Sequence, residues 1–102
     1  MDTVTISDAR RFSLDAIQKT ELLATGDLRV SLLCFEAGQR DEEAAYGRTI
    51  IYQVLEGEVL VRGSADSRRL GPGKLLTVAP GTTHLLENAG GGLLVVLATQ
   101  AG

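Results

Sequence analysis

Residues 73–88 read GKLLTVAPGTTHLLEN and contain the clearest structural signals in the chain. The breakers Gly71-Pro72-Gly73 and Pro80-Gly81 bracket a short run of β-formers at 74–79, and a second apolar run at 84–87 follows. Short apolar runs bounded by glycine and proline are typical of β-strands joined by tight turns. The stretch therefore predicts two strands separated by a turn.

The same pattern of apolar runs and turn signals continues in both directions from this stretch. Only residues 8–18 could form a helical turn. Short strands at this even spacing indicate a sandwich or a barrel, so we expect an all-β fold. The further strands are predicted at 19–25, 28–35, 49–55, 59–62 and 93–99, with a hairpin at Glu56-Gly57-Glu58.

Length and composition narrow the class of protein. The 102 residues suit one domain spanning 1–102, and the hydrophobic content of 44% is enough for a core. A net charge of -3 without a basic stripe argues against a nucleic-acid surface. The sequence lacks the pattern of a signal peptide, and its longest apolar stretch, 93–98, is too short to cross a bilayer. The single cysteine, Cys34, lies in an apolar run and is interpreted as a buried thiol. We therefore expect a cytoplasmic protein with neither nucleic-acid nor membrane partners.

Residues 73–88 also match a family motif. The second motif of the cupin family reads G-x5-P-x-G-x2-H-x3-N, and every marked position except the first proline matches. The chain therefore resembles the cupins, roughly over residues 28–98, and the resemblance implies a small double-stranded β-helix, a jelly-roll barrel of the RmlC-like kind. The matching residues are Gly73, Gly81, His84 and Asn88, with Ala79 at the proline position and Pro80 after it.

The first cupin motif, G-x5-H-x-H-x3,4-E-x6-G, keeps its frame but not its ligands. Gly38 and Gly57 stand at its two ends. Between them, the two histidine positions hold Ala44 and Tyr46, and the glutamate position holds Ile50. The resemblance therefore implies a degenerate metal site, in which His84 is the remaining ligand.

A divalent metal ion needs several converging N, O or S donors, which methyl and branched alkyl groups do not supply. A tyrosine hydroxyl ligates only when a strong Lewis acid removes its proton. The acidic run Asp41-Glu42-Glu43 could supply carboxylates, but three consecutive loop residues rarely point at one site, so a solvated loop is favoured. We therefore expect no metal and no other cofactor.

What remains is the barrel interior. Strand alternation from Ile50 directs Tyr52 inward, and alternation from His84 directs Leu86 inward. The interior is then largely apolar, which suits either a small apolar or weakly polar ligand or a barrel filled with side chains. The candidate ligand-binding residues are His84, Tyr46, Tyr52, Ile50, Ala44 and Leu86.

His84 admits two main interpretations. It is either a buried histidine bonded to a tyrosine hydroxyl or a backbone carbonyl, or a group that contacts ligand or transfers protons. The function we prefer is a non-catalytic module that binds or senses a small molecule, with His84 as a ligand contact, or that acts as a dimeric interaction partner. The alternative is a metal-independent isomerase or lyase, with His84 as general base and Tyr46 as donor. One histidine and one tyrosine do not define a reaction.

A homodimer is also expected. Several predicted strands, such as 93–97, are apolar at successive positions, which is typical of strands covered on both faces. In a domain of this size the second cover is often another copy of the chain, and the cupins that the chain resembles commonly form dimers.

We expect the purified protein to hold less than one equivalent of zinc, iron, manganese or nickel per chain, because Ala44 and Ile50 cannot ligate. Elemental analysis of the dialysed protein measures this content. One tightly held metal ion per chain, lost in His84→Ala, would contradict the expectation.

Overall fold

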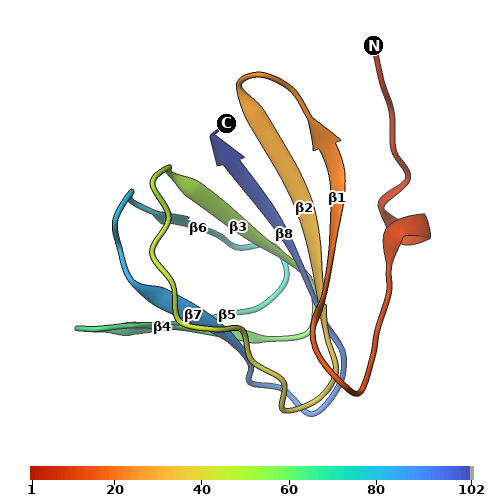
Figure 1. Ribbon diagram of the computed structural model, residues 1–102. Helices are drawn as coiled ribbons and strands as arrows, with labels where there is room; N and C mark the ends of the chain where they lie inside the picture. The colour runs from red at the N-terminus through yellow and green to blue at the C-terminus, as the bar shows by residue number, and fades with distance from the viewer. Residues whose placement is uncertain (102) are drawn as a thin grey trace.

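Two antiparallel β-sheets face each other in the computed structural model, which describes residues 1–101 (Figure 1). The five-stranded sheet has the order β1-β2-β8-β3-β6 and consists of β1 (Gln18–Ala24), β2 (Leu28–Phe35), β8 (Leu94–Ala101), β3 (Ile50–Glu56) and β6 (Leu75–Val78). The three-stranded sheet has the order β5-β4-β7 and consists of β5 (Ser67–Leu70), β4 (Val59–Gly63) and β7 (His84–Asn88).

The all-β prediction is confirmed, and each predicted strand is present within a few residues of its expected bounds. Strand β5 was missed because only Leu70 of its four residues is buried, so it carries no apolar run. The predicted helical turn at 8–18 is largely wrong, since the chain instead forms a 3-10 turn, η1 (Ile6–Ala9), followed by irregular backbone. Within residues 1–101, no helix is long and apolar enough to span a membrane.

The core lies between the two sheets and follows strand alternation. Along β3, Tyr52 and Val54 are buried while Ile51 between them is exposed. Opposite them, β4 and β7 contribute Val59 and Leu86, which are less than 2% exposed. Burial of one such aliphatic side chain stabilises the fold by about 1.5–3 kcal/mol relative to exposure. The packed inner faces therefore hold the sheets together.

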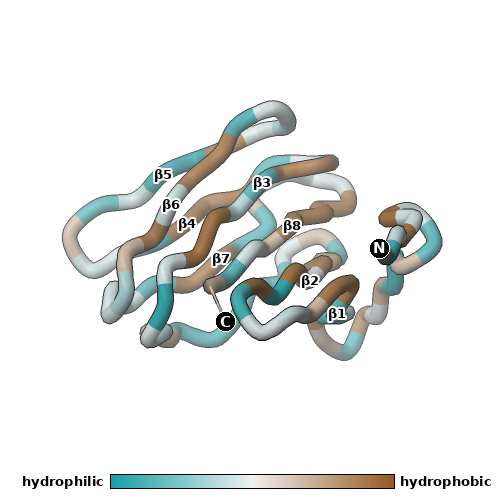
Figure 2. Tube along the Cα trace, turned by 90° about the horizontal axis from the view of Figure 1, so that it is seen from above, coloured by the Kyte–Doolittle hydropathy of each residue, from teal (hydrophilic) through white to brown (hydrophobic). Residues whose placement is uncertain are grey.

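A second apolar cluster covers part of the outer face of the five-stranded sheet. Leu32, Cys34 and Val95 are buried there, beneath Ile6, Ala9 and Phe12 of the N-terminal segment. Figure 1 shows this segment passing alongside β1, and Figure 2 shows the largely hydrophobic course of β8. The chain's own N-terminal segment thus provides part of the second cover that the apolar strands led us to expect. Cys34 is buried, as predicted.

The motif glycines and Asn88 fix the turns. The four glycines at motif positions, Gly38, Gly57, Gly73 and Gly81, are the residues with positive φ in the described chain. At Gly57 a side chain is also excluded by space, because an added Cβ would collide with the carbonyl oxygen of Leu93. The Asn88 side-chain amide donates to the carbonyl oxygens of Glu36 and Gly92, at 3.0 and 2.8 Å. These contacts fasten the end of β7 to the end of β2 and close that end of the barrel.

We propose that the rest of the outer face mediates homodimer formation. Leu28, Ile51 and Leu75 lie on this face by strand alternation and register, and they are 49%, 38% and 67% exposed. Ile51→Glu places a charge at this face and is expected to convert a dimer into a monomer, as measured by sedimentation at micromolar concentration.

Leu14→Glu is the matched control, because Leu14 is 85% exposed and lies outside the sheets. It should leave the dimer intact. A wild-type protein that sediments as a monomer would contradict the proposal.

Candidate functional site

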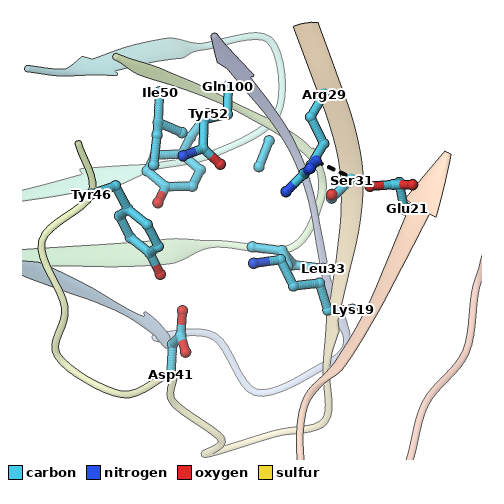
Figure 3. A pocket seen from close by; sticks show the side chains of 11 residues that line it. Lys19, Glu21, Arg29, Ser31, Leu33, Asp41, Tyr46, Ile50, Tyr52 and Gln100 are labelled. Atoms are coloured by element: carbon cyan, nitrogen blue, oxygen red, sulfur yellow. Dashed lines mark ion pairs between the residues drawn. The ribbon is translucent and has the colours of Figure 1, made fainter. Parts of the chain in front are cut away.

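A cavity of about 290 Å³ opens between the inner face of the five-stranded sheet and the segment that joins β2 to β3 (Figure 3). We call it the mouth cavity. Its volume is close to that of roughly ten molecules of liquid water, enough for a small organic molecule. It is lined by Lys19, Glu21, Arg29, Ser31, Leu33, Asp41, Tyr46, Ile50, Tyr52, Ala98 and Gln100.

Strand register assembles most of this lining. Glu21 pairs with Ser31, Ser31 with Ala98, and Ala98 with Tyr52, which places one row of side chains across four strands. A second row runs from Arg29 to Gln100 and on to Ile50. Cross-strand partners point to the same face of a sheet, so both rows face the interior. The five-stranded sheet thus provides one continuous wall of the cavity.

The segment between β2 and β3 provides the opposite wall by pairing with β7. The amide of Ala44 donates to the carbonyl of His84 at 3.0 Å, and the amide of His84 donates back to the carbonyl of Ala44 at 2.9 Å. The amide of Asp41 donates to the carbonyl of Leu86 at 2.8 Å. The amide of Gly81 donates to the carbonyl of Tyr46, also at 2.8 Å. These bonds hold Asp41 and Tyr46 at the cavity.

A buried hydrogen bond of 2.8 Å joins Tyr52 Oη to His84 Nε2. The other ring nitrogen, Nδ1, lies 2.9 Å from the carbonyl oxygen of Thr82. Because a carbonyl only accepts, Nδ1 of the neutral ring carries the proton, and Nε2 accepts from the Tyr52 hydroxyl. His84 is only 3% exposed, so the interaction fixes the position of the hydroxyl.

Both tyrosines of the chain line the mouth cavity, and both hold their protons more strongly than a free tyrosine does. Burial raises the pKa of Tyr52, and the nearby Tyr46 and Asp41 raise it further. Burial also raises the pKa of Tyr46, with a smaller contribution from Asp41. At neutral pH the two hydroxyls therefore act as hydrogen-bonding groups, and neither is a base.

His84 itself lies behind the wall of the mouth cavity. It lines a separate cavity of about 250 Å³, together with Val61, Thr82 and the ion pair of Arg68 with Asp66 at 2.8 Å. Its ring also packs against both tyrosines, with ring centroids 5.8 Å from Tyr46 and 5.7 Å from Tyr52. The histidine thus reaches the mouth cavity only through the hydroxyl it binds.

The candidate ligand-binding residues separate in the structure. Tyr46, Tyr52 and Ile50 come together at the mouth cavity. Ala44 pairs with His84 through its backbone, and Leu86 is buried in the core at 1% exposure. The sequence also led us to expect a largely apolar interior, whereas this end of the barrel is polar.

The lining residues that sequence reasoning missed are mostly polar. Alternation from Leu33 would have directed Ser31 and Arg29 inward on the same strand, and this was the available signal. The loop carboxylate Asp41, interpreted as solvated with Glu42 and Glu43, lines the cavity, whereas those two glutamates are exposed. The strand pairing must be known before one can predict that Lys19, Glu21 and Gln100 line the cavity.

The four positions that the resemblance assigns to metal ligands do not suit a metal ion. Ala44 and Ile50 have no donor atom, and the Nε2 lone pair of His84 accepts a hydrogen bond from the Tyr52 hydroxyl. Within residues 1–101, no three side chains of histidine, cysteine, aspartate or glutamate are grouped to hold a metal. The arrangement is suited to hydrogen bonding.

No protein-family model matches the sequence, and no curated protein matches it. Solved structures do match. A protein of Thermus thermophilus superimposes with a TM-score of 0.92 at 22% identity, over 99% of this chain and 97% of that one. An RmlC-like cupin of Desulfovibrio desulfuricans superimposes with a TM-score of 0.87 at 21% identity, over 99% of this chain and 96% of that one.

A third structure, from Klebsiella pneumoniae, is described as having a double-stranded β-helix domain and matches with a TM-score of 0.91 at 19% identity, over 99% of this chain and 90% of that one. The predicted resemblance is therefore confirmed for the fold: the chain adopts the double-stranded β-helix of small single-domain cupins.

We predict that Tyr52→Phe lowers the free energy of unfolding by about 1–3 kcal/mol, because it leaves the buried Nε2 of His84 without its donor. His84→Ala should cost at least as much, since it also removes packing. Urea denaturation measures both.

Tyr46→Phe is the matched control, because the hydroxyl of Tyr46 makes no hydrogen bond within residues 1–101. Removing this hydroxyl should change the free energy of unfolding by less than about 0.5 kcal/mol. Nitrogen NMR of the single histidine should show the Nδ1-protonated ring. Equal losses in the two tyrosine variants would refute the assignment.

Proposed function

We propose that the protein is a non-catalytic module that binds a small molecule in the mouth cavity. The observation that carries the proposal is Tyr52, which lines this cavity and whose hydroxyl is held in place by His84. A polar group that is already oriented binds its ligand without a further ordering cost. The cavity thus has the character of a preformed site.

The lining combines a small apolar area with several polar groups. Leu33, Ile50 and Ala98 offer apolar surface to the body of a ligand. The Tyr52 hydroxyl donates a hydrogen bond to His84, so its oxygen can still accept a hydrogen bond from the ligand. This mixed lining suits a small ligand that has both an apolar part and a polar group.

The alternative function, a metal-independent isomerase or lyase, is less well supported. A general base needs an unoccupied lone pair within reach of the substrate. Both ring nitrogens of His84 are engaged, by Tyr52 and by Thr82, and the ring does not line the mouth cavity. Burial raises the pKa of Tyr46, the expected donor, which makes its hydroxyl a weaker acid than a free tyrosine. These contacts favour binding over proton transfer.

Fluorine NMR tests the proposal directly, because both tyrosines line the cavity and protein labelled with 3-fluorotyrosine gives one signal from each. In a screen of small carboxylates, amides, alcohols and phenols, we expect bound compounds to shift both signals. Ala98→Leu fills the cavity and should weaken binding by at least about tenfold.

Ala45→Leu makes the same change at an exposed position outside the cavity lining and should leave binding unchanged. A screen in which no compound shifts the tyrosine signals, or an Ala98→Leu variant that binds as well as wild type, would overturn the proposed function.

A further inference from the structure

One wall of the mouth cavity carries more hydrogen-bond donors than the protein uses. This wall is formed by β1 and β2 and holds Lys19, Arg29 and Ser31, with Glu21 beside them (Figure 3). Strand pairing places these side chains together, since Lys19 is opposite Leu33 and Glu21 is opposite Ser31. We call this group the donor wall.

Ser31 is the clearest member. The residue is 6% exposed, yet its hydroxyl makes no hydrogen bond within residues 1–101 and is not sealed from the cavity. Because this oxygen is open to the cavity, water can satisfy it there, and a ligand acceptor can take the place of that water. At the same position a valine would satisfy strand and burial preferences better. The hydroxyl therefore faces the cavity as an unused donor.

Arg29 and Lys19 add positive charge to the same wall. The Nε of Arg29 lies 3.1 Å from Oε1 of Glu21, the one ion pair that Arg29 makes within residues 1–101. A guanidinium has five N–H donors, so among these residues the outer edge with the two Nη groups is left for a second partner. Lys19 forms no ion pair within residues 1–101, and Figure 3 shows its amino group directed toward the cavity.

The negative charges limit what this wall can hold. The carboxylate of Glu21 is paired with Arg29, and Asp41 lies on the facing wall, where its Oδ1 accepts from the amide of Glu42 at 2.7 Å. The charges of the four charged lining residues, two positive and two negative, therefore sum to zero. An anion of any charge is attracted by Lys19 and Arg29 and repelled by the two carboxylates, so this neutral lining does not favour a second negative charge on the ligand.

We infer that the ligand is a small monocarboxylic acid, bound as the carboxylate by Lys19, Arg29 and Ser31, with its apolar body against Leu33 and Ile50. This inference rests on the proposed function and revises the mostly apolar ligand that the sequence led us to expect. A planar carboxylate can meet the free edge of Arg29 with two parallel hydrogen bonds. The Ser31 hydroxyl, deeper in the wall, donates to the same group.

Matched pairs of probes test the charge of the ligand. Benzoate and benzamide, or hexanoate and hexanamide, have nearly the same shape and differ in charge. Binding is followed by the two fluorotyrosine signals and by calorimetry at low salt. We expect at least one carboxylate to bind about tenfold or more tightly than its amide. Inorganic phosphate should bind more weakly than that carboxylate.

Lys19→Gln and Ser31→Ala test the donor wall. Lys19 has no ion pair to lose, so folding should be unchanged, while carboxylate affinity falls severalfold and amide affinity stays constant. Ser31→Ala should act in the same direction. Lys74→Gln is the matched control, because it removes the chain's other lysine outside the cavity lining.

The outcomes separate the inference from the proposed function. Equal binding of carboxylates and amides, or carboxylate binding that Lys19→Gln and Ser31→Ala leave unchanged, would overturn the inference while the cavity remains a binding site. A screen in which only neutral compounds bind would also overturn the inference and leave the proposed function intact. If no compound of either kind shifts the tyrosine signals, the inference and the proposed function both fail.

Discussion

The hydrogen bond between Tyr52 and His84 joins the two sheets across the interior of the barrel. Tyr52 belongs to the five-stranded sheet and His84 to the three-stranded one, and both residues are almost fully buried. On one side of this bond the interior is packed with aliphatic side chains, and on the other it opens into the mouth cavity. Because a buried polar pair is stable only when both members are satisfied, the bond fixes how far the apolar core extends. It also fixes where the cavity begins.

The same bond gives a physical account of the degenerate first motif. A metal ion at this place would need the Nε2 lone pair of His84, and the Tyr52 hydroxyl occupies that lone pair. Ala44 and Ile50, at two of the other positions, supply no donor atom to a metal ion. Asn88 keeps a purely structural role, since its amide fastens β7 to the chain after β2. In this structure the second motif provides a turn at Gly81 and cross-links at Asn88.

The sequence predicted the architecture better than it predicted the site. Turn residues such as Gly57 and Gly81 are local signals, and the structure places both at positive φ, where a motif glycine is needed. Strand β5 was missed because exposed arginines give no apolar pattern. The cover over β2 was assigned only to a second copy, because nothing local shows that Phe12 folds back onto Cys34. The donor wall depends on the pairing of β1 with β2, which no residue type specifies.

Strand β2 shows how one strand can serve stability at one end and binding at the other. Its inward residues run from Phe35, which has no exposed surface, through Leu33 to Ser31 and Arg29 at the cavity. A barrel built only for stability would continue the apolar series to the mouth, because aliphatic side chains there would close the cavity and need no partners. Positions that break the local rule without a compensating contact within the protein are typical of functional sites. The Ser31 hydroxyl makes no hydrogen bond within residues 1–101 and is such a position, since it is open to water or to a ligand that enters the cavity.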